Sequence, residues 1–293
     1  MAEKHTSCTE KLYFLERSVI MRRILCVLSE FGYWGEELIG PYETLVKNGM
    51  VVDFITPTGK RPHALEPSMD SSFVDPALGK PVVSEEMAEK VKKMEESDLL
   101  DKPMNLSKLI GERPYMCSST YLRDFEAYNQ SVEKTADFLK KYDALLLIGG
   151  SGPILDMGNN QRVHDLIKIF VSEDKPVAAE CYGVACLAFA RDYWIRKSLI
   201  CGKHVTGHPL EYDYKDGTGF YGYDINIGPA PYPLEFILRD AVGSEGEFIG
   251  NVGKTISAVV DYPFITGRST GDSYKTGELL VEVLENGLRR YGW

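Results

Sequence analysis

The chain has 293 residues, of which 44% are hydrophobic, so it is long enough to bury a large core in one elaborated α/β domain. Its net charge of -10 disfavours nucleic acid and anionic membrane surfaces as partners, because both are negatively charged. A small molecule or another protein remains as the partner class.

The cysteines follow neither a disulfide framework nor a metal-binding pattern. The six lie at positions 8, 26, 117, 181, 186 and 201, without the C-x-x-C spacing of metal sites. We therefore expect reduced thiols, a cytoplasmic location and no metal. The apolar run at residues 24–28 is too short to span a bilayer, so we expect no membrane segment.

The first part of the chain alternates apolar strands with a helix. Residues 1–21 are predicted to be an N-terminal extension, in which the apolar run 12–15 is an edge strand or part of a loosely ordered arm. Residues 23–29 and 51–56 predict parallel strands covered on both faces, and the helix between them ends near Asn48 and Gly49. This right-handed βαβ unit predicts a doubly wound sheet with its site at the carboxyl ends of the strands.

The middle of the chain is less regular. Residues 57–83 are rich in proline and glycine and predict a long loop. Helices are predicted at 85–96, near 105–110 and at 132–140, whereas residues 115–129 are rich in aromatic residues without a clear period. We interpret residues 84–131 as a cap inserted into a single domain that spans residues 22–293.

The remaining elements return to an α/β pattern. Residues 143–148 predict the most apolar strand, which ends in a glycine-rich loop whose backbone N–H groups can approach a ligand closely. Further predictions are a helix at 161–172, a hairpin or edge strand at 198–208, a helix at 234–239, strands at 256–261 and 264–267, and a closing helix at 277–290.

Residues 176–188 predict a strand, a sharp turn and a helix, with Cys181 on the turn. Such a turn lifts a nucleophile out of the sheet, and the N-terminus of the new helix favours a thiolate. We therefore expect the pKa of Cys181 to be lower than that of a free thiol. A buried structural cysteine at a strand end is the alternative.

Three motifs in this order resemble the DJ/PfpI superfamily of class I glutamine-amidotransferase-like proteins. They are Gly32-x4-Glu37-x3-Pro41, the loop 149–152 followed by Asp156, and Ala179-x-Cys181-x-Gly183. The chain is most similar to the branch of heat-shock chaperones and glutathione-independent glyoxalases through Asp75-Pro76, Pro103-x-x-Leu106 and Thr266-Gly267. The resemblance implies a flavodoxin-like sheet sandwiched by helices, and a homodimer.

The resemblance also implies a site in which Cys181 is the nucleophile and Glu37 shares a proton with its sulfur. A partly buried carboxyl stays protonated, so Glu37 could donate a hydrogen bond to the thiolate and later pass the proton to a substrate. The residues alone favour interpreting Glu37 as an acid at a helix N-terminus, and the spacing of the resembling motif reverses this preference; Glu36 is the neighbouring alternative.

Backbone N–H groups near Gly150, Ser151 and Gly152, together with Tyr182, are expected to bind the substrate and stabilise an oxyanion. Tyr182 stands where this branch usually has a histidine, and Ser151 where it commonly has another, so a Cys-His-Glu triad is replaced by a dyad. His208 is the best candidate for a substitute histidine.

Further positions complete the predicted site. Trp34 is predicted as an additional site residue, whereas His63, His164 and His204 are expected to lie elsewhere. The aromatic segments 115–128 and 212–223 either wall a substrate pocket or pack between cap and sheet.

These residues predict an enzyme with a cysteine nucleophile and no cofactor, acting on a small electrophilic carbonyl, imine or amide by lyase, hydratase or hydrolase chemistry. The alternative is a non-enzymatic chaperone or a cysteine-based sensor of oxidative stress, in which Cys181 is oxidised reversibly.

Overall fold

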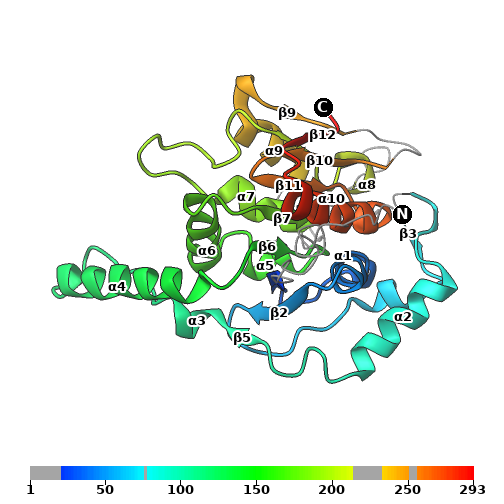
Figure 1. The fold of residues 1–293 in the computed structure, drawn as a ribbon, viewed down its shortest axis with the longest axis horizontal. Helices are drawn as coiled ribbons and strands as arrows, with labels where there is room; N and C mark the ends of the chain where they lie inside the picture. The colour runs from blue at the N-terminus through cyan, green and yellow to red at the C-terminus, as the bar shows by residue number, and fades with distance from the viewer. Residues whose placement is uncertain (1–20, 76–77, 214–232, 251–255) are drawn as a thin grey trace, which may run out of the picture.

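The computed structural model describes residues 21–75, 78–213, 233–250 and 256–293 (Figure 1). The predicted extension, with its apolar run at 12–15, therefore lies almost entirely outside the described residues.

An eight-stranded sheet forms the centre of the molecule, in the order β12-β10-β11-β7-β6-β1-β2-β5. Its strands are β1 (Arg23–Val27), β2 (Val51–Thr56), β5 (Met104–Asn105), β6 (Ala144–Leu147), β7 (Val177–Glu180), β10 (Ala258–Asp261), β11 (Phe264–Gly267) and β12 (Arg290–Tyr291). The strands from β5 to β11 are parallel, whereas β10 pairs antiparallel with both β11 and β12. The predicted doubly wound, mainly parallel α/β sheet is confirmed.

Helices cover both faces of this sheet, because the strand side chains alternate between two cores. In β1, Leu25 and Val27 belong to one core, and Ile24 and Cys26 to the other. The first core is closed by α4 (Tyr121–Leu139), α6 (Gln161–Ser172), α7 (Ala185–Phe189) and α9 (Leu234–Val242). The second is closed by α1 (Gly35–Lys47), α2 (Glu85–Glu96) and α10 (Ser273–Asn286).

Short elements complete the described chain. They are the helices α3 (Leu106–Leu109), α5 (Pro153–Asp156) and α8 (Leu210–Asp213), the 3-10 turns η1 (Glu66–Met69), η2 (Cys181–Val184), η3 (Gly243–Glu245) and η4 (Thr270–Asp272), and the strand pairs β3 (Val74–Asp75) with β4 (Lys80–Pro81) and β8 (His204–Val205) with β9 (Glu247–Phe248). The predicted loop at 57–83 thus contains one helical turn and a small hairpin.

Several predicted helices have different bounds in the structure. α9, predicted at 234–239, extends to Val242, and α10, predicted to end at 290, ends at Asn286. α4 is continuous from Tyr121, where the sequence predicted a helix only from residue 132, and it projects from one end of the molecule (Figure 1). Its inward side chains Phe125, Tyr128 and Val132 are spaced three and four residues apart, which is a helical period that the surrounding polar residues obscure. α10 begins at Ser273, four residues before the predicted start, because a capping box formed by Ser269 and Asp272 starts the helical turn before it.

The segment 198–208 is not a hairpin. Its only strand among the described residues is β8, which pairs parallel with β9, about forty residues later in the chain. The helix predicted to run from Gly183 toward Arg191 ends at Phe189. None of the helices in the described residues combines the length and apolar character that a bilayer crossing requires.

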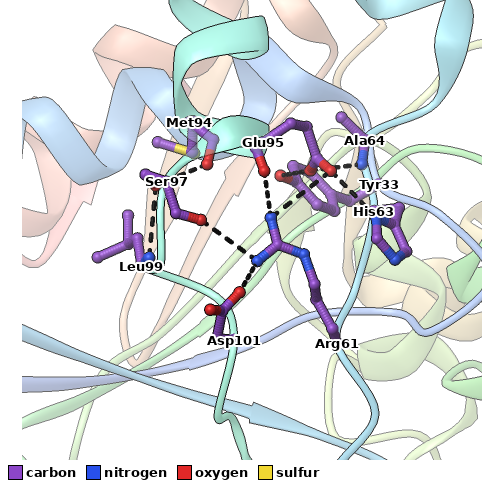
Figure 2. A network of polar contacts seen from close by, with 9 residues as sticks. All are labelled: Tyr33, Arg61, His63, Ala64, Met94, Glu95, Ser97, Leu99 and Asp101. Carbon is purple, nitrogen blue, oxygen red and sulfur yellow. Dashed lines mark hydrogen bonds and ion pairs between the residues drawn. The ribbon is translucent and has the colours of Figure 1, made fainter.

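A polar network centred on Glu95 of α2 fixes the loop that leads into α1 (Figure 2). Its carboxyl accepts hydrogen bonds from the Tyr33 hydroxyl at 2.7 Å and the Ala64 N–H at 2.8 Å, and it pairs with Nδ1 of His63 at 3.1 Å. Arg61 joins the network through the Ser97 carbonyl at 3.3 Å. Because Tyr33 directly precedes Trp34, the network holds the start of α1 in place.

Candidate active site

Cys181 lies at the carboxyl end of β7, in the middle of the sheet. It is the first residue of η2 and has a φ of +53°, in the left-handed region that strains a residue other than glycine. The turn is tight, since a Cβ on Gly183 would lie 2.7 Å from the carbonyl oxygen of Leu147. The predicted strand, sharp turn and helix are confirmed, and the turn directs the thiol toward the loops at the end of the sheet.

Two side chains meet the sulfur of Cys181. Nδ1 of His208 lies 3.3 Å from Sγ, and the carboxyl of Glu37 hydrogen-bonds to the thiol. The backbone N–H groups of Gly150 and Tyr182 also point at the sulfur. The structure thus brings together five of the residues selected from the sequence, and Glu37 rather than Glu36 is the acid at the sulfur. Glu36 instead accepts a hydrogen bond from Thr270 at 2.6 Å.

Glu37 is an acid that stays protonated at neutral pH. Its side chain is 2% exposed, and burial raises its pKa to about 8, although the hydrogen bond to Cys181 and the field of His208 lower it. A protonated carboxyl can donate a hydrogen bond to sulfur. Glu37 therefore presents a protonated carboxyl to the sulfur from the first turn of α1.

The pKa of Cys181 is raised, which corrects the expectation of an acidified thiol. Burial is the main cause, followed by the charge of Glu37, and the N–H groups of Gly150 and Tyr182 lower it only in part. The expected helix effect is small because η2 and α7 are four and five residues long. The thiol therefore needs a nearby base, and His208 lies within reach.

His208 reaches the sulfur from a separate part of the chain. Its ring stacks on that of Tyr182 with centroids 4.7 Å apart, and it meets the edge of Tyr212 at 5.6 Å. Tyr182, the residue after the nucleophile, thus supports the ring of the histidine that approaches the sulfur.

The other described histidines lie elsewhere, as predicted. His204 stacks on Trp293 at 3.5 Å, His63 pairs with Glu95, and His164 contacts the Gly158 carbonyl at 2.7 Å. In the part of the chain that the structure describes, no group of histidine, cysteine, aspartate and glutamate side chains could hold a metal ion.

A cavity of about 330 Å³ opens at Cys181. Trp34, Gly150, Tyr182 and His208 line it together with Cys181 and Glu37. Ser151 and Gly152 do not belong to the lining of the cavity. Gly152 instead packs closely against the carbonyl of Gly32. The structure therefore does not bring these two residues to the substrate space.

The aromatic segments have different roles. Tyr212 lines the cavity, and residues 214–223 lie outside the described residues. The segment 115–128 contributes nothing to the cavity lining; instead Tyr128 is buried in the first core, with Phe125 packed against it. For Phe125 and Tyr128 the packing alternative is correct, whereas Tyr115 is exposed and belongs to neither the cavity nor a core.

Sequence reasoning missed two sides of the cavity. One consists of Asp75, Leu78, Lys80, Pro81 and Val82 at β3 and β4, and the other is formed by the loop after β11. Its lining residues there are Arg268, Ser269, Thr270, Gly271 and Asp272. A signal was present, because β11 is a parallel strand beside β7 and sites of such sheets lie at the carboxyl ends of strands.

Fold and site together define an α/β protein with a cysteine on a nucleophile turn, assisted by a carboxyl and a histidine. The model of the ThiJ/PfpI family-like proteins matches residues 28–210, and the chain belongs to this family. No curated protein matches the chain in sequence.

Solved structures share the fold. Rapid Encystment Protein 24 kDa of Francisella tularensis is 17% identical, with a TM-score of 0.61 over 90% of this chain and 99% of that one. Glyoxalase III of Candida albicans is also 17% identical, with a TM-score of 0.59 over 91% and 98%. DJ-1beta of Drosophila melanogaster is 16% identical, with a TM-score of 0.51 over 90% of each chain. At these identities the likeness establishes the fold alone.

Proposed function

We propose that the protein is a cofactor-independent enzyme in which Cys181 adds to a small electrophilic carbonyl compound, in chemistry of the lyase, hydratase or hydrolase type. The observation that carries this proposal is the 3.3 Å contact between Sγ of Cys181 and Nδ1 of His208 at a cavity that also receives Glu37. A nucleophile, a base and a protonated acid then face the same space.

The addition step uses each of these groups once. Nδ1 of His208 accepts the thiol proton as the sulfur forms a bond to the carbonyl carbon. The π electrons of the carbonyl move to its oxygen, which takes the proton of Glu37 and yields a neutral hemithioacetal. The N–H groups of Gly150 and Tyr182, which point at the sulfur, stabilise the charge that develops there.

A carbonyl compound is preferred over an amide because addition to an aldehyde or ketone expels no leaving group, so the one proton of Glu37 completes the step, whereas cleavage of an amide needs a further proton transfer to the departing amine. An imine adds the thiol in the same way as a carbonyl, with its nitrogen taking the proton. One structural relative is a glyoxalase. Glyoxal-type dicarbonyl compounds are therefore the first substrates to screen.

The burial of Cys181 disfavours the alternative of an oxidation sensor. Sensor cysteines combine a low pKa with exposure to oxidant, whereas Cys181 is 4% exposed and burial raises its pKa. A chaperone role predicts that suppression of client aggregation does not depend on the thiol of Cys181.

Turnover of a panel of dicarbonyls, aldehydes and small amides tests the proposal. We expect wild-type protein to convert a dicarbonyl and Cys181→Ala to lose this activity, while Cys117→Ser, which changes an exposed thiol, retains it. Activity that persists in Cys181→Ala would refute the proposal. So would suppression of client aggregation by both proteins alike without any turnover, which would favour the chaperone.

A further inference from the structure

The cavity at Cys181 contains a buried arginine that the addition step does not use. Arg268 follows β11 directly and is 4% exposed. Its Nε donates to Oδ2 of Asp272 at 3.3 Å, and its Nη1 donates to the Gly250 carbonyl at 3.4 Å. These contacts hold the guanidinium group in one orientation at the cavity.

Arg268 lies near the reacting groups. The ring of Tyr212 is 5.6 Å from that of His208, and its centroid is 5.7 Å from Cζ of Arg268, so this ring neighbours both. Arg268, Tyr212, His208 and Cys181 all line the same cavity of about 330 Å³. A cavity of this size holds a small molecule in contact with several of its lining residues.

Arg268 is the better placed of the two described cations in the lining. Lys80 is exposed to water, where the attraction of an ammonium group for an anion is weak. Arg268 is buried, so water screens the attraction between its guanidinium group and an anion less. Its planar fork also matches the two oxygens of a carboxylate, which a lysine cannot match.

The described lining holds three acids, Asp75, Asp272 and Glu37. Oδ1 of Asp75 accepts the Leu78 N–H at 2.8 Å, and the other two leave room for an anion at Arg268. Oδ1 of Asp272 accepts the Ser257 N–H at 2.6 Å, and Oδ2 accepts the Ser269 N–H at 3.2 Å in addition to Arg268, so its negative charge is shared among several donors. Glu37 is neutral at pH 7, because its pKa is raised to about 8. An anionic substrate group at Arg268 is therefore not opposed by a second bare carboxylate at the sulfur.

We propose that Arg268 is a specificity-determining residue that binds a carboxylate of the substrate, which makes the substrate a small carbonyl compound that also carries a carboxylate, such as a 2-oxo acid or an aldehyde acid. This inference rests on the proposed function, in which the substrate occupies the cavity at Cys181. It adds the chemical class of a second group of that substrate.

Two alkylating reagents that differ only in charge test the inference. Iodoacetate and iodoacetamide each form an S–C bond to a thiol and release iodide, but only iodoacetate is a carboxylate. Mass spectrometry gives the rate at Cys181 and, as an internal reference, at the exposed Cys117. We expect the iodoacetate-to-iodoacetamide rate ratio to be ~10-fold or more higher at Cys181 than at Cys117, as for a charge-assisted hydrogen bond.

In Arg268→Gln, the iodoacetate-to-iodoacetamide rate ratios at Cys181 and Cys117 should lie within about threefold of each other, because the amide keeps polar contacts without the charge. Arg239→Gln is the matched control, since it removes one positive charge from a residue that does not line the cavity. A thermal melt checks the fold. If Arg268→Gln fails to fold, Arg268→Lys replaces it, because this variant keeps the charge but loses the planar fork. Its iodoacetate-to-iodoacetamide rate ratio at Cys181 should lie between the wild-type ratio at Cys181 and the ratio at Cys117.

A second measurement does not depend on the thiol. In Cys181→Ser, calorimetry should detect pyruvate binding ~10-fold or more tighter than binding of its neutral amide, and Arg268→Gln should abolish the difference. Equal ratios in wild type and a folded Arg268→Gln, or equal binding of acid and amide, would overturn the inference. If Cys181 resists both reagents, the proposed function fails and calorimetry alone decides the carboxylate site.

Discussion

The sulfur of Cys181 lies 3.3 Å from Nδ1 of His208, a residue 27 positions further along the chain. A histidine thus lies beside the thiol of Cys181, although the residue directly after Cys181 in the chain is a tyrosine. Tyr182 packs its ring on His208 and so belongs to the support of the base. The site has the three kinds of group that a cysteine-histidine-acid mechanism requires, drawn from three separate segments.

Replacing either proton carrier should slow turnover strongly. Glu37→Gln and His208→Asn each keep a similar shape but remove an acid-base group, which usually contributes ~10² to ~10⁴ in rate. Steady-state kinetics on a substrate from the screen measures both, with His63→Asn as a control at an exposed ring away from the cavity. A near-wild-type rate for His208→Asn would return the site to a dyad of Cys181 and Glu37.

The rate should also depend on the protonation of Glu37. Because burial raises its pKa to about 8 and the addition step needs its proton, kcat should fall as the pH rises through about 8. Glu37→Gln cannot ionise, so its residual rate should lack this decline. A decline that persists unchanged in Glu37→Gln would assign it to another group.

Alkylation by iodoacetamide should distinguish the cysteines. Cys26 and Cys186 are fully buried and burial raises their pKa values, so they should react last, whereas the exposed Cys117 and the cavity-lining Cys181 should react first. Because the pKa of Cys181 is also raised, its rate should increase toward alkaline pH rather than be high in mild acid. Peptide mapping at several pH values tests this, and fast labelling of Cys181 at pH 5 would contradict it.

Gly149 should not tolerate a side chain. A Cβ there would contact Oε2 of Glu37 and lie 2.5 Å from the carbonyl oxygen of Glu180. Gly149→Ala should therefore destabilise the fold by ~1–3 kcal/mol, the usual cost of overpacking, and displace Glu37. Gly271→Ala is the matched control for stability, because nothing lies within 4 Å of its Cβ. Urea denaturation compares the two, and equal stabilities would show that the site relaxes around the extra methyl group.

Glu180 should make stability fall as the pH rises. It is fully buried, and burial, followed by the charges of Glu37 and Asp272, raises its pKa well above the usual value. In the unfolded chain the carboxyl ionises near ~4.3, whereas in the folded protein it keeps its proton to higher pH. The folded state thus binds more protons, and the free energy of unfolding declines by ~1.4 kcal/mol per pH unit above the unfolded pKa until the folded pKa is reached.

Glu180→Gln has no proton to release, so its free energy of unfolding should decline less between pH 5 and pH 9. Glu37 contributes a similar decline up to about pH 8 in wild type and in Glu180→Gln. The effect of Glu180 is therefore the difference between the free energies of unfolding of the two proteins at each pH. Chemical denaturation at several pH values measures it. Parallel curves for wild type and Glu180→Gln would contradict the assignment.

The regular elements were predictable where the apolar pattern was unambiguous. The bounds of β2, α2 and α6 are those expected from residues 51–56, 85–96 and 161–172. The start of α4 is not predicted because its inward aromatic residues are separated by charged ones. In the segment 198–208 the hairpin alternative is wrong, whereas the edge-strand alternative is present as β8, a two-residue strand whose partner comes from distant residues. Local pattern cannot report a partner that is far away in the chain.

The sequence by itself determined the turn at Cys181, since it depends on a local backbone signal, a strand that ends at a small-residue turn. Glu37 stood out only through the resemblance of its motif to a family, because the residues alone are also explained by an acid in the first turn of a helix. Only the tertiary structure decided their chemistry. The pKa values of Cys181 and Glu37 are raised because packing excludes water from both, and the helix effect expected from the sequence is smaller than that desolvation. His208 and Arg268 reach the cavity because separate loops converge at the carboxyl edge of the sheet, which is a property of the folded chain and of no single segment.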